Sequence, residues 1–183
     1  MKLSMRIISL AVMAALLLGL ASINLFSNFR SVAAANDQLA NKLNQSDALD
    51  FQARLKIYAE LRAQQEALLI QNPIEPYAWM RLAYLRSATQ GNRRYAFEAL
   101  RFADAIAQPD NVGGLERILM WHDYASVQTE AERKHEQELW QTAYRLNWYS
   151  LFDMATYHHL LNELKSAIME DPELAARWNK THQ

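Results

Sequence analysis

The sequence predicts an all-α protein with one amino-terminal transmembrane helix, followed by a small helical domain. Residues 7–26 form a run of twenty residues without a charge. The rest of the 183-residue chain is rich in Ala, Leu, Glu, Gln and Arg, and the whole sequence holds only four glycines and four prolines, too few turn residues for a sheet protein. Because no run of strand length alternates between apolar and polar residues, we expect helices only.

The apolar run, IISLAVMAALLLGLASINLF, is long enough to span a membrane, because twenty helical residues reach about 30 Å, the thickness of a hydrocarbon core. Lys2 and Arg6 precede the run, whereas only Arg30 follows it closely. This basic excess places residues 1–6 in the cytoplasm and the chain after residue 26 on the other side of the membrane.

A second interpretation of the same segment is a signal peptide that is removed after export. Ala33 and Ala35 give the small-residue pattern that precedes a cleavage site, and the mature chain would then begin at Asn36. The apolar run is longer than the roughly 7–15 residues that are usual in a signal peptide. We therefore expect the helix to be retained.

Small residues recur along one side of the predicted span. Ala11, Ala15 and Gly19 follow one another at intervals of four, which places them on one face of a helix. Such a face can pack closely against another transmembrane helix. The alternative is that these residues simply face lipid.

Residues 27–45 are rich in Ala, Asn, Ser and Gln, a composition that suits either a linker or a continuation of the membrane helix. One all-helical domain is expected over residues 46–183. Ser46 or Asp47 is a suitable amino-terminal cap for its first helix. That helix should end near Gln71, because Pro73 lacks a backbone donor and disfavours helical geometry in the residue before it.

Glycine and proline also mark the later helix ends. Pro76 suits the first turn of a second helix, which runs to about residue 88 and is followed by a turn at Gly91. A third helix stops at Pro109. After a loop with two glycines, the apolar spacing predicts helices over residues 115–127, 129–146, 149–169 and 172–178.

Charge and composition exclude several functions. The net charge of the chain is −1, with 19 basic and 20 acidic residues. Without Lys2 and Arg6, the chain after the span has 17 basic residues and 20 acidic ones, so the domain has no excess of basic residues for binding nucleic acid. The chain has no cysteine, which excludes disulfides, thiolate zinc sites and a thiol nucleophile. Its four glycines form no phosphate-binding loop, so we expect no cofactor.

The remaining polar residues predict neither an active site nor a metal site. His158 and His159 are adjacent, so on a helix they point about 100° apart and cannot hold one ion together. Glu130 and Glu132 lie among basic residues in a pattern typical of a solvated helix face. We therefore expect a protein that is not an enzyme.

One part of the chain resembles the tetratricopeptide repeat, a hairpin of two helices. In this pattern small side chains let the two helices approach closely, and bulky ones fill the space between hairpins. The matching residues are Trp79, Leu82, Ala83, Ala96, Leu100, Ala103 and Pro109. Arg86 departs from the pattern, which prefers an aromatic residue there, and only one unit is evident. The resemblance thus implies a tetratricopeptide-like domain rather than a regular array.

Three stretches, residues 72–88, 96–111 and 169–178, together with the single predicted span, resemble the VpsP-type accessory proteins of bacterial exopolysaccharide gene clusters. The resemblance implies an inner-membrane protein with a cytoplasmic amino terminus and a periplasmic domain. Its function would be that of a non-catalytic scaffold or adapter, which assists polysaccharide biosynthesis or export through contacts with other envelope proteins. Two alternatives remain open: a carbohydrate-binding envelope protein, and a tetratricopeptide-like assembly factor for another envelope complex.

Aromatic and basic side chains provide the candidate contact residues. We expect Trp79, Trp140 and Tyr144 in the core, because they fall on apolar stripes. Other aromatic residues are expected at the surface, where rings contact a protein or stack on sugar. The predicted interaction surface consists of Trp148, Tyr149, Phe152 and Tyr157, with Arg81, Arg93, Arg94 and Arg101 on the opposite face of the repeat.

Overall fold

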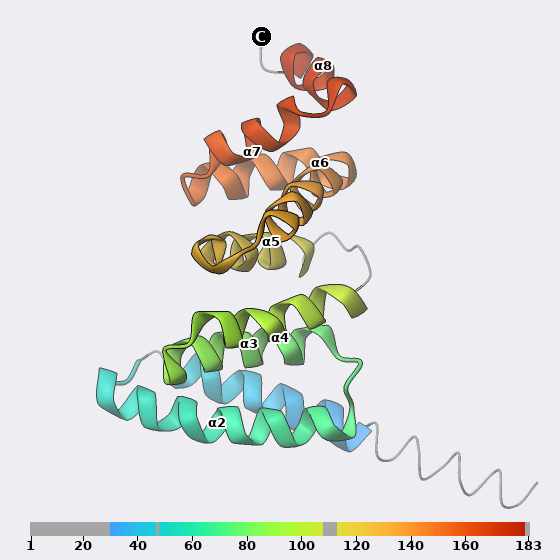
Figure 1. Ribbon diagram of the computed structural model, residues 1–183. Helices are drawn as coiled ribbons and strands as arrows, with labels where there is room; N and C mark the ends of the chain where they lie inside the picture. Colours follow the sequence, from blue (N-terminus) through green and yellow to red (C-terminus); the bar gives the residue numbers. More distant parts are fainter. Residues whose placement is uncertain (1–29, 47, 108–112, 182–183) are drawn as a thin grey trace, which may run out of the picture. The chain divides into compact units, whose positions relative to one another are not determined.

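The computed structural model describes residues 30–46, 48–107 and 113–181, and every regular element in these ranges is a helix (Figure 1). The predicted all-α class is therefore confirmed for this part of the chain. No helix in it is long and apolar enough to cross a membrane. The predicted span over residues 7–26 lies outside the described residues, and so does its packing face, Ala11, Ala15 and Gly19.

The chain divides into two compact units, unit 1 up to Pro73 and unit 2 from Ile74 onward. The segment that the sequence left open between linker and helix is helical from residue 30. Its helix ends at residue 46, where the sequence analysis placed the start of a single domain. The first helix of that expected domain therefore belongs to a separate unit.

Unit 1 is a hairpin of the helix over residues 30–46 and α2 (Phe51–Gln71). Asp50 caps α2, because its carboxylate accepts hydrogen bonds from the backbone N–H groups of Gln52 and Ala53, each at 3.0 Å. The predicted cap Ser46 instead ends the preceding helix, where its hydroxyl donates to the Leu43 carbonyl at 2.6 Å. The predicted end of α2 at Gln71 is confirmed.

The two helices of unit 1 run antiparallel, and apolar side chains are buried along both of them. The buried apolar residues are Val32, Leu39, Tyr58, Leu61 and Leu69. Gln65 is fully buried on the same face, and its side-chain amide donates to the side-chain oxygen Oδ1 of Asn36 at 3.0 Å. This bond joins the two helices and helps to fix which of their residues lie opposite each other.

Unit 2 begins with a hairpin of α3 (Pro76–Gln90) and α4 (Arg93–Ile106). Gly91 joins the helices with φ 64°, a left-handed conformation that glycine adopts readily. Small residues line the contact between them, as the sequence predicted. Ala83, Ala96 and Ala103 are all fully buried, which lets the two backbones approach closely.

The middle of unit 2 consists of α5 (Gly113–Asp123), the 3₁₀ turn η1 (Ala125–Val127) and α6 (Glu130–Tyr157). The prediction of one helix over residues 115–127 was wrong at its end, since the chain leaves α-helical geometry after Asp123. The boundary expected between residues 146 and 149 is a kink inside α6, where Asn147 has φ −154° and ψ 75°.

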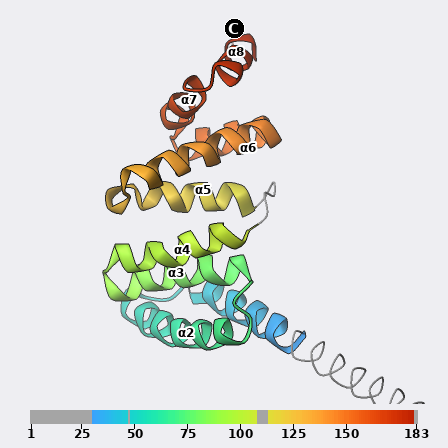
Figure 2. The same ribbon diagram turned by 45° about the vertical axis from the view of Figure 1, so that its right-hand side comes forward.

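The carboxyl-terminal part contains α7 (Leu161–Met169) and α8 (Pro172–Thr181). Figures 1 and 2 show that the helices of unit 2 follow one another in chain order, and each contacts the next. The predicted helix over residues 149–169 was wrong, because the chain turns at His158 and His159. Residues of four helices share one core here, including Ile118, Trp140, Tyr144, Leu151, Leu164, Ile168, Leu174 and Trp178.

Candidate interaction surfaces

Three of the four predicted contact arginines lie on α4 and hold neighbouring elements. Arg93 donates to the Asp123 carbonyl, and its guanidinium lies 5.3 Å from the centre of the Tyr124 ring. Arg94 donates to the Val127 carbonyl at 3.1 Å. The fourth, Arg81, lies half-buried on α3 and also has internal interactions. The arginines of α4 therefore act first as links within unit 2.

Glu132 is the centre of these links. Both its oxygens accept hydrogen bonds from Arg94, at 2.7 and 2.9 Å, and Arg101 Nε lies 3.1 Å away. The Thr129 backbone N–H and hydroxyl also donate to it, at 2.7 and 2.9 Å. The Glu132 N–H donates in turn to Thr129 Oγ1 at 3.4 Å, which completes a capping box at the start of α6. The Arg94 hydrogen bonds outweigh burial and lower the pKa of Glu132 to about 2. This carboxylate is thus charged at neutral pH and links α4 to the start of α6.

A second polar group joins α4, α5 and α6 around Asp104. His135 Nε2 lies 2.5 Å from one carboxylate oxygen of Asp104, and Arg117 Nε lies 3.6 Å from the other. The hydrogen bond to Asp104 raises the pKa of His135. The His135 ring also contacts buried Trp121, with the ring centres 5.0 Å apart. This histidine is an interhelical contact in a position that the sequence left unassigned.

The predicted aromatic surface on α6 divides into exposed and packed rings. Tyr149 and Tyr157 are 63% and 80% exposed, whereas Trp148 and Phe152 pack against the carboxyl-terminal core. Trp148 and Tyr149 meet edge to face, with ring centres 5.8 Å apart. Tyr157 lies two turns further along α6, about 12 Å away, beside His158. The structure therefore brings together only part of this predicted set.

Another aromatic surface, on the α3–α4 hairpin, was missed by the sequence analysis. Trp79 and Phe102 are in contact with ring centres 4.5 Å apart and ring planes tilted by 49°, and the Arg86 guanidinium lies 4.0 Å from the centre of the Tyr95 ring. Tyr95 and Phe102 are 44% and 43% exposed. Trp79, expected in the core, is only half-buried. We call these four residues, Trp79, Arg86, Tyr95 and Phe102, the aromatic strip.

Spacing within each helix explains how the aromatic strip forms. Trp79 and Arg86 are seven residues apart on α3, and Tyr95 and Phe102 are seven apart on α4, so each pair lies on one face. Antiparallel pairing then places the first residue of one pair beside the last residue of the other. The spacing can be read from the sequence. It does not show whether these residues are buried or exposed, because that depends on which faces of the hairpin other elements cover.

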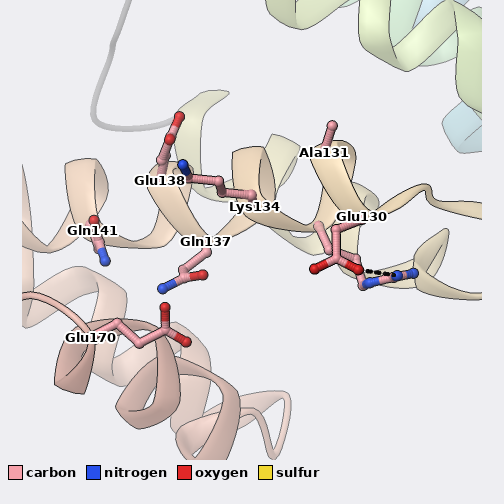
Figure 3. Close-up of a pocket in the computed structure, with 8 residues that line it drawn as sticks. Glu130, Ala131, Lys134, Gln137, Glu138, Gln141 and Glu170 are labelled. Carbon is pink, nitrogen blue, oxygen red and sulfur yellow. Dashed lines mark ion pairs between the residues drawn. The ribbon is translucent and has the colours of Figure 1, made fainter.

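A polar hollow of about 720 Å³ lies beside the first half of α6 (Figure 3). Figure 3 shows Gln137 and Glu170 approaching each other across it, and Glu130 pairs with Arg133 at 3.5 Å. Its lining consists of Glu130, Ala131, Arg133, Lys134, Gln137, Glu138, Gln141 and Glu170. None of these residues has an aromatic ring to stack on a sugar, and their charges largely balance.

Neither a search for metal-binding groups nor comparison with known proteins assigns a function to the chain. Within residues 30–46, 48–107 and 113–181, no group of three or more His, Asp or Glu side chains could hold a metal ion. Comparisons with protein-family models, with curated proteins and with solved structures find no significant match.

Proposed function

We propose that this protein is a non-catalytic scaffold or adapter, anchored in a bacterial inner membrane, whose helices lie in the periplasm and assist exopolysaccharide biosynthesis or export. The anchor rests on the apolar run over residues 7–26 and on Lys2 and Arg6 before it. The pathway rests on the resemblance to VpsP-type proteins. The tetratricopeptide-like character rests on the α3–α4 hairpin with its alanine-lined contact.

The observation that carries the proposal is the exposure of the aromatic strip. The hairpin has a complete core without these rings, since Leu82, Phe97 and Leu100 are buried between its helices. Aromatic and arginine side chains dominate the binding energy of protein interfaces. Trp79 packs against Phe102, and the Arg86 guanidinium packs against the Tyr95 ring. These contacts order the side chains of the strip before a partner binds, which lowers the conformational entropy lost on binding.

The surroundings of the strip match the usual anatomy of a protein interface, an aromatic centre with a polar rim. Glu98 lies on α4 between Tyr95 and Phe102 in sequence, and it pairs with Arg94 at 2.8 Å and with Arg101 at 3.0 Å. The charges of Glu98, Arg94 and Arg101 are therefore paired with one another, so the surface does not require a strongly charged partner. Another envelope protein is the partner that such a surface favours.

Site-specific photo-crosslinking in intact membranes tests this proposal. A photoreactive amino acid replaces Phe102 of the full-length chain, and Tyr84, which is 45% exposed on another face of α3, is replaced in the same way as a matched control. We expect a discrete protein adduct from position 102 and none from position 84. Equal adducts from both positions, or none from position 102, would contradict the proposal.

Carbohydrate binding remains a second candidate, because Tyr149 is exposed beside Trp148 and offers a ring to a sugar. Titration of the purified full-length chain with the polysaccharide of its host distinguishes the two. Saturable binding that is lost in Tyr149→Ala but kept in Tyr95→Ala would favour the carbohydrate function. Absence of binding, together with an adduct from position 102, would favour the adapter.

A further inference from the structure

One end of unit 1 carries a large apolar side chain that no other described residue of unit 1 covers. Ile70, in the last turn of α2, is 85% exposed, more than any other large hydrophobic residue in the described part of the chain. Its neighbour Leu69 is buried, so the helix has its inner face covered at this point and presents Ile70 outward. Transfer of such an exposed side chain from water into an apolar phase is favourable.

The register of the hairpin places Ile70 near the predicted membrane span. The Gln65–Asn36 bond sets α2 antiparallel to the preceding helix, and Ala35 and Leu68 line one surface hollow together a turn further on. Continued by one more turn, this register brings Ile70 level with the start of the helix over residues 30–46. Figure 1 shows the beginning of that helix beside the end of α2.

Chain length limits how far this end lies from the hydrocarbon core. Only four peptide links separate Arg30 from the end of the apolar run at residue 26. Four extended residues reach at most about 14 Å, so Arg30 lies within that distance of the boundary however the intervening residues are arranged. The end of the hairpin that carries Ile70 is therefore close to the lipid headgroups if residues 7–26 span the membrane.

Charge at this end suits an anionic bilayer surface. We call residues 30–36 and 67–73 the hairpin base. Arg30, which is exposed, is its one charged residue. The opposite end of the hairpin carries Asp50, Arg54 and Lys56. The nearest acidic residues of unit 1, Asp37 and Glu66, lie just outside the hairpin base, further from the start of the helix over residues 30–46 than Arg30. An apolar side chain with a cation suits the interfacial layer, where apolar groups insert and anionic headgroups attract basic residues.

We propose that the hairpin base rests in the headgroup layer of an anionic membrane, with Ile70 inserted and Arg30 beside the phosphates. This inference rests on the proposed membrane anchor. The base then forms a second membrane contact besides the span, and it holds the hairpin upright with residues 48–50 pointing away from the lipid.

The absence of cysteine from the chain allows a direct test. Ile70→Cys and, separately, Phe51→Cys are introduced into the full-length protein and labelled with the environment-sensitive fluorophore NBD. Phe51 is a matched control, because it is 67% exposed at the other end of α2, about 28 Å away along the helix. Both proteins are reconstituted into anionic vesicles of phosphatidylethanolamine and phosphatidylglycerol.

We expect a blue-shifted emission at position 70 and quenching by nitroxide-labelled lipids that is several-fold stronger than at position 51. A water-like signal at position 70 would overturn the inference, and so would equal quenching at both positions. Flotation of the vesicles separates this failure from failure of the anchor. If the protein floats but position 70 stays water-exposed, only the inference falls; if the protein does not float, the proposed anchor falls with it.

Discussion

Glu132 illustrates how a single residue acquires its role from its position on a helix. In the sequence, Glu130 and Glu132 are two acidic residues beside basic ones, and both were assigned to a solvated face. In the structure the side chain of Glu130 is 96% exposed, whereas that of Glu132 is 9% exposed and holds two arginines of α4. The spacing of Thr129 and Glu132 is that of a capping box, so part of this role could have been read from the sequence.

The acid dependence of stability should report this carboxylate. Because the folded-state pKa of Glu132 is about 2, below its ordinary value of 4.5, its contribution is present above pH 4.5 and is lost as the pH falls towards 2. Glu132→Gln should lower the free energy of unfolding by about 1–3 kcal/mol at neutral pH, with the difference from wild type shrinking in acid.

Urea unfolding of the full chain in detergent, followed by circular dichroism at several pH values, measures this difference. Glu130→Gln is the matched control, and its effect should stay within about 0.5 kcal/mol. A constant difference between Glu132→Gln and wild type from neutral pH to pH 2 would show that ionisation of Glu132 does not stabilise the fold.

His159 is the one residue other than glycine with positive φ in the described part of the chain, at 60°. It follows α6 in a Schellman motif, with bonds from the Leu160 N–H to the Ala155 carbonyl at 2.7 Å and from its own N–H to the Thr156 carbonyl at 3.2 Å. Glycine is the usual residue in this position, so the helix end was hidden from the sequence analysis.

His159→Gly should therefore raise the free energy of unfolding by about 1 kcal/mol, because the left-handed conformation is unfavourable for residues with a Cβ atom. Gly91→Ala should have the opposite effect, a loss of about 1 kcal/mol. No atom lies within 4 Å of a Cβ at position 91, so that loss would be conformational alone. Thermal unfolding of both variants measures the pair, and a destabilised His159→Gly would refute the account of this turn.

At the scale of elements, glycine and proline predicted several boundaries and missed others. The end of α2, the start of α3 and the turn at Gly91 were predicted correctly, because Pro73, Pro76 and Gly91 restrict the backbone directly. The kink in α6 lies at Asn147, whose side-chain oxygen Oδ1 accepts a hydrogen bond from the Ser150 N–H at 3.2 Å. An asparagine does not by itself predict a kink or a helix end, since asparagine is also tolerated within helices.

Asn147→Ala removes this internal cap and should destabilise unit 2 by about 1 kcal/mol. Asn162→Ala on α7 is a suitable control, because Asn162 is exposed and should change stability by less than about 0.5 kcal/mol. Urea midpoints of the two variants provide the comparison. If both variants matched wild type, the cap at the kink would contribute nothing to folding.

Unit 1 offers a prediction about two helices together. Asn36→Leu should cost about 1–3 kcal/mol, because it removes the buried 3.0 Å hydrogen bond that the Gln65 amide donates to the Asn36 side chain. The double variant, with Gln65→Leu added, should recover much of this loss. A double-mutant cycle by urea unfolding measures the coupling, expected at about 0.5–3 kcal/mol. Strictly additive effects would contradict a direct interaction between the two amides.

At the scale of the whole molecule, the sequence predicted the helical class but not the division into two units. Residues 27–45 have no clear apolar period in the sequence. The contact between this segment and α2 includes two buried polar residues, Asn36 and Gln65, so an apolar pattern did not predict it. The aromatic strip was missed for a similar reason. A ring with helical spacing is usually core, and only the packing of α3 on α4 leaves Tyr95 and Phe102 outside.

Membrane topology is the central claim that most of the proposed function depends on. The cysteine-free chain allows single cysteines at Ser4, before the apolar run, and at Tyr149, which is 63% exposed in unit 2. A maleimide that cannot cross the inner membrane is applied to bacteria whose outer membrane has been permeabilised and whose inner membrane is intact; these are called intact cells below. Labelling of Ser4→Cys after lysis serves as the internal control for reactivity.

The account predicts that Tyr149→Cys is labelled in intact cells, that Ser4→Cys is labelled only after lysis, and that the labelled protein keeps its full-length mass in the membrane fraction. Protection of Tyr149→Cys in intact cells, or a soluble mature protein that begins at Asn36, would contradict it.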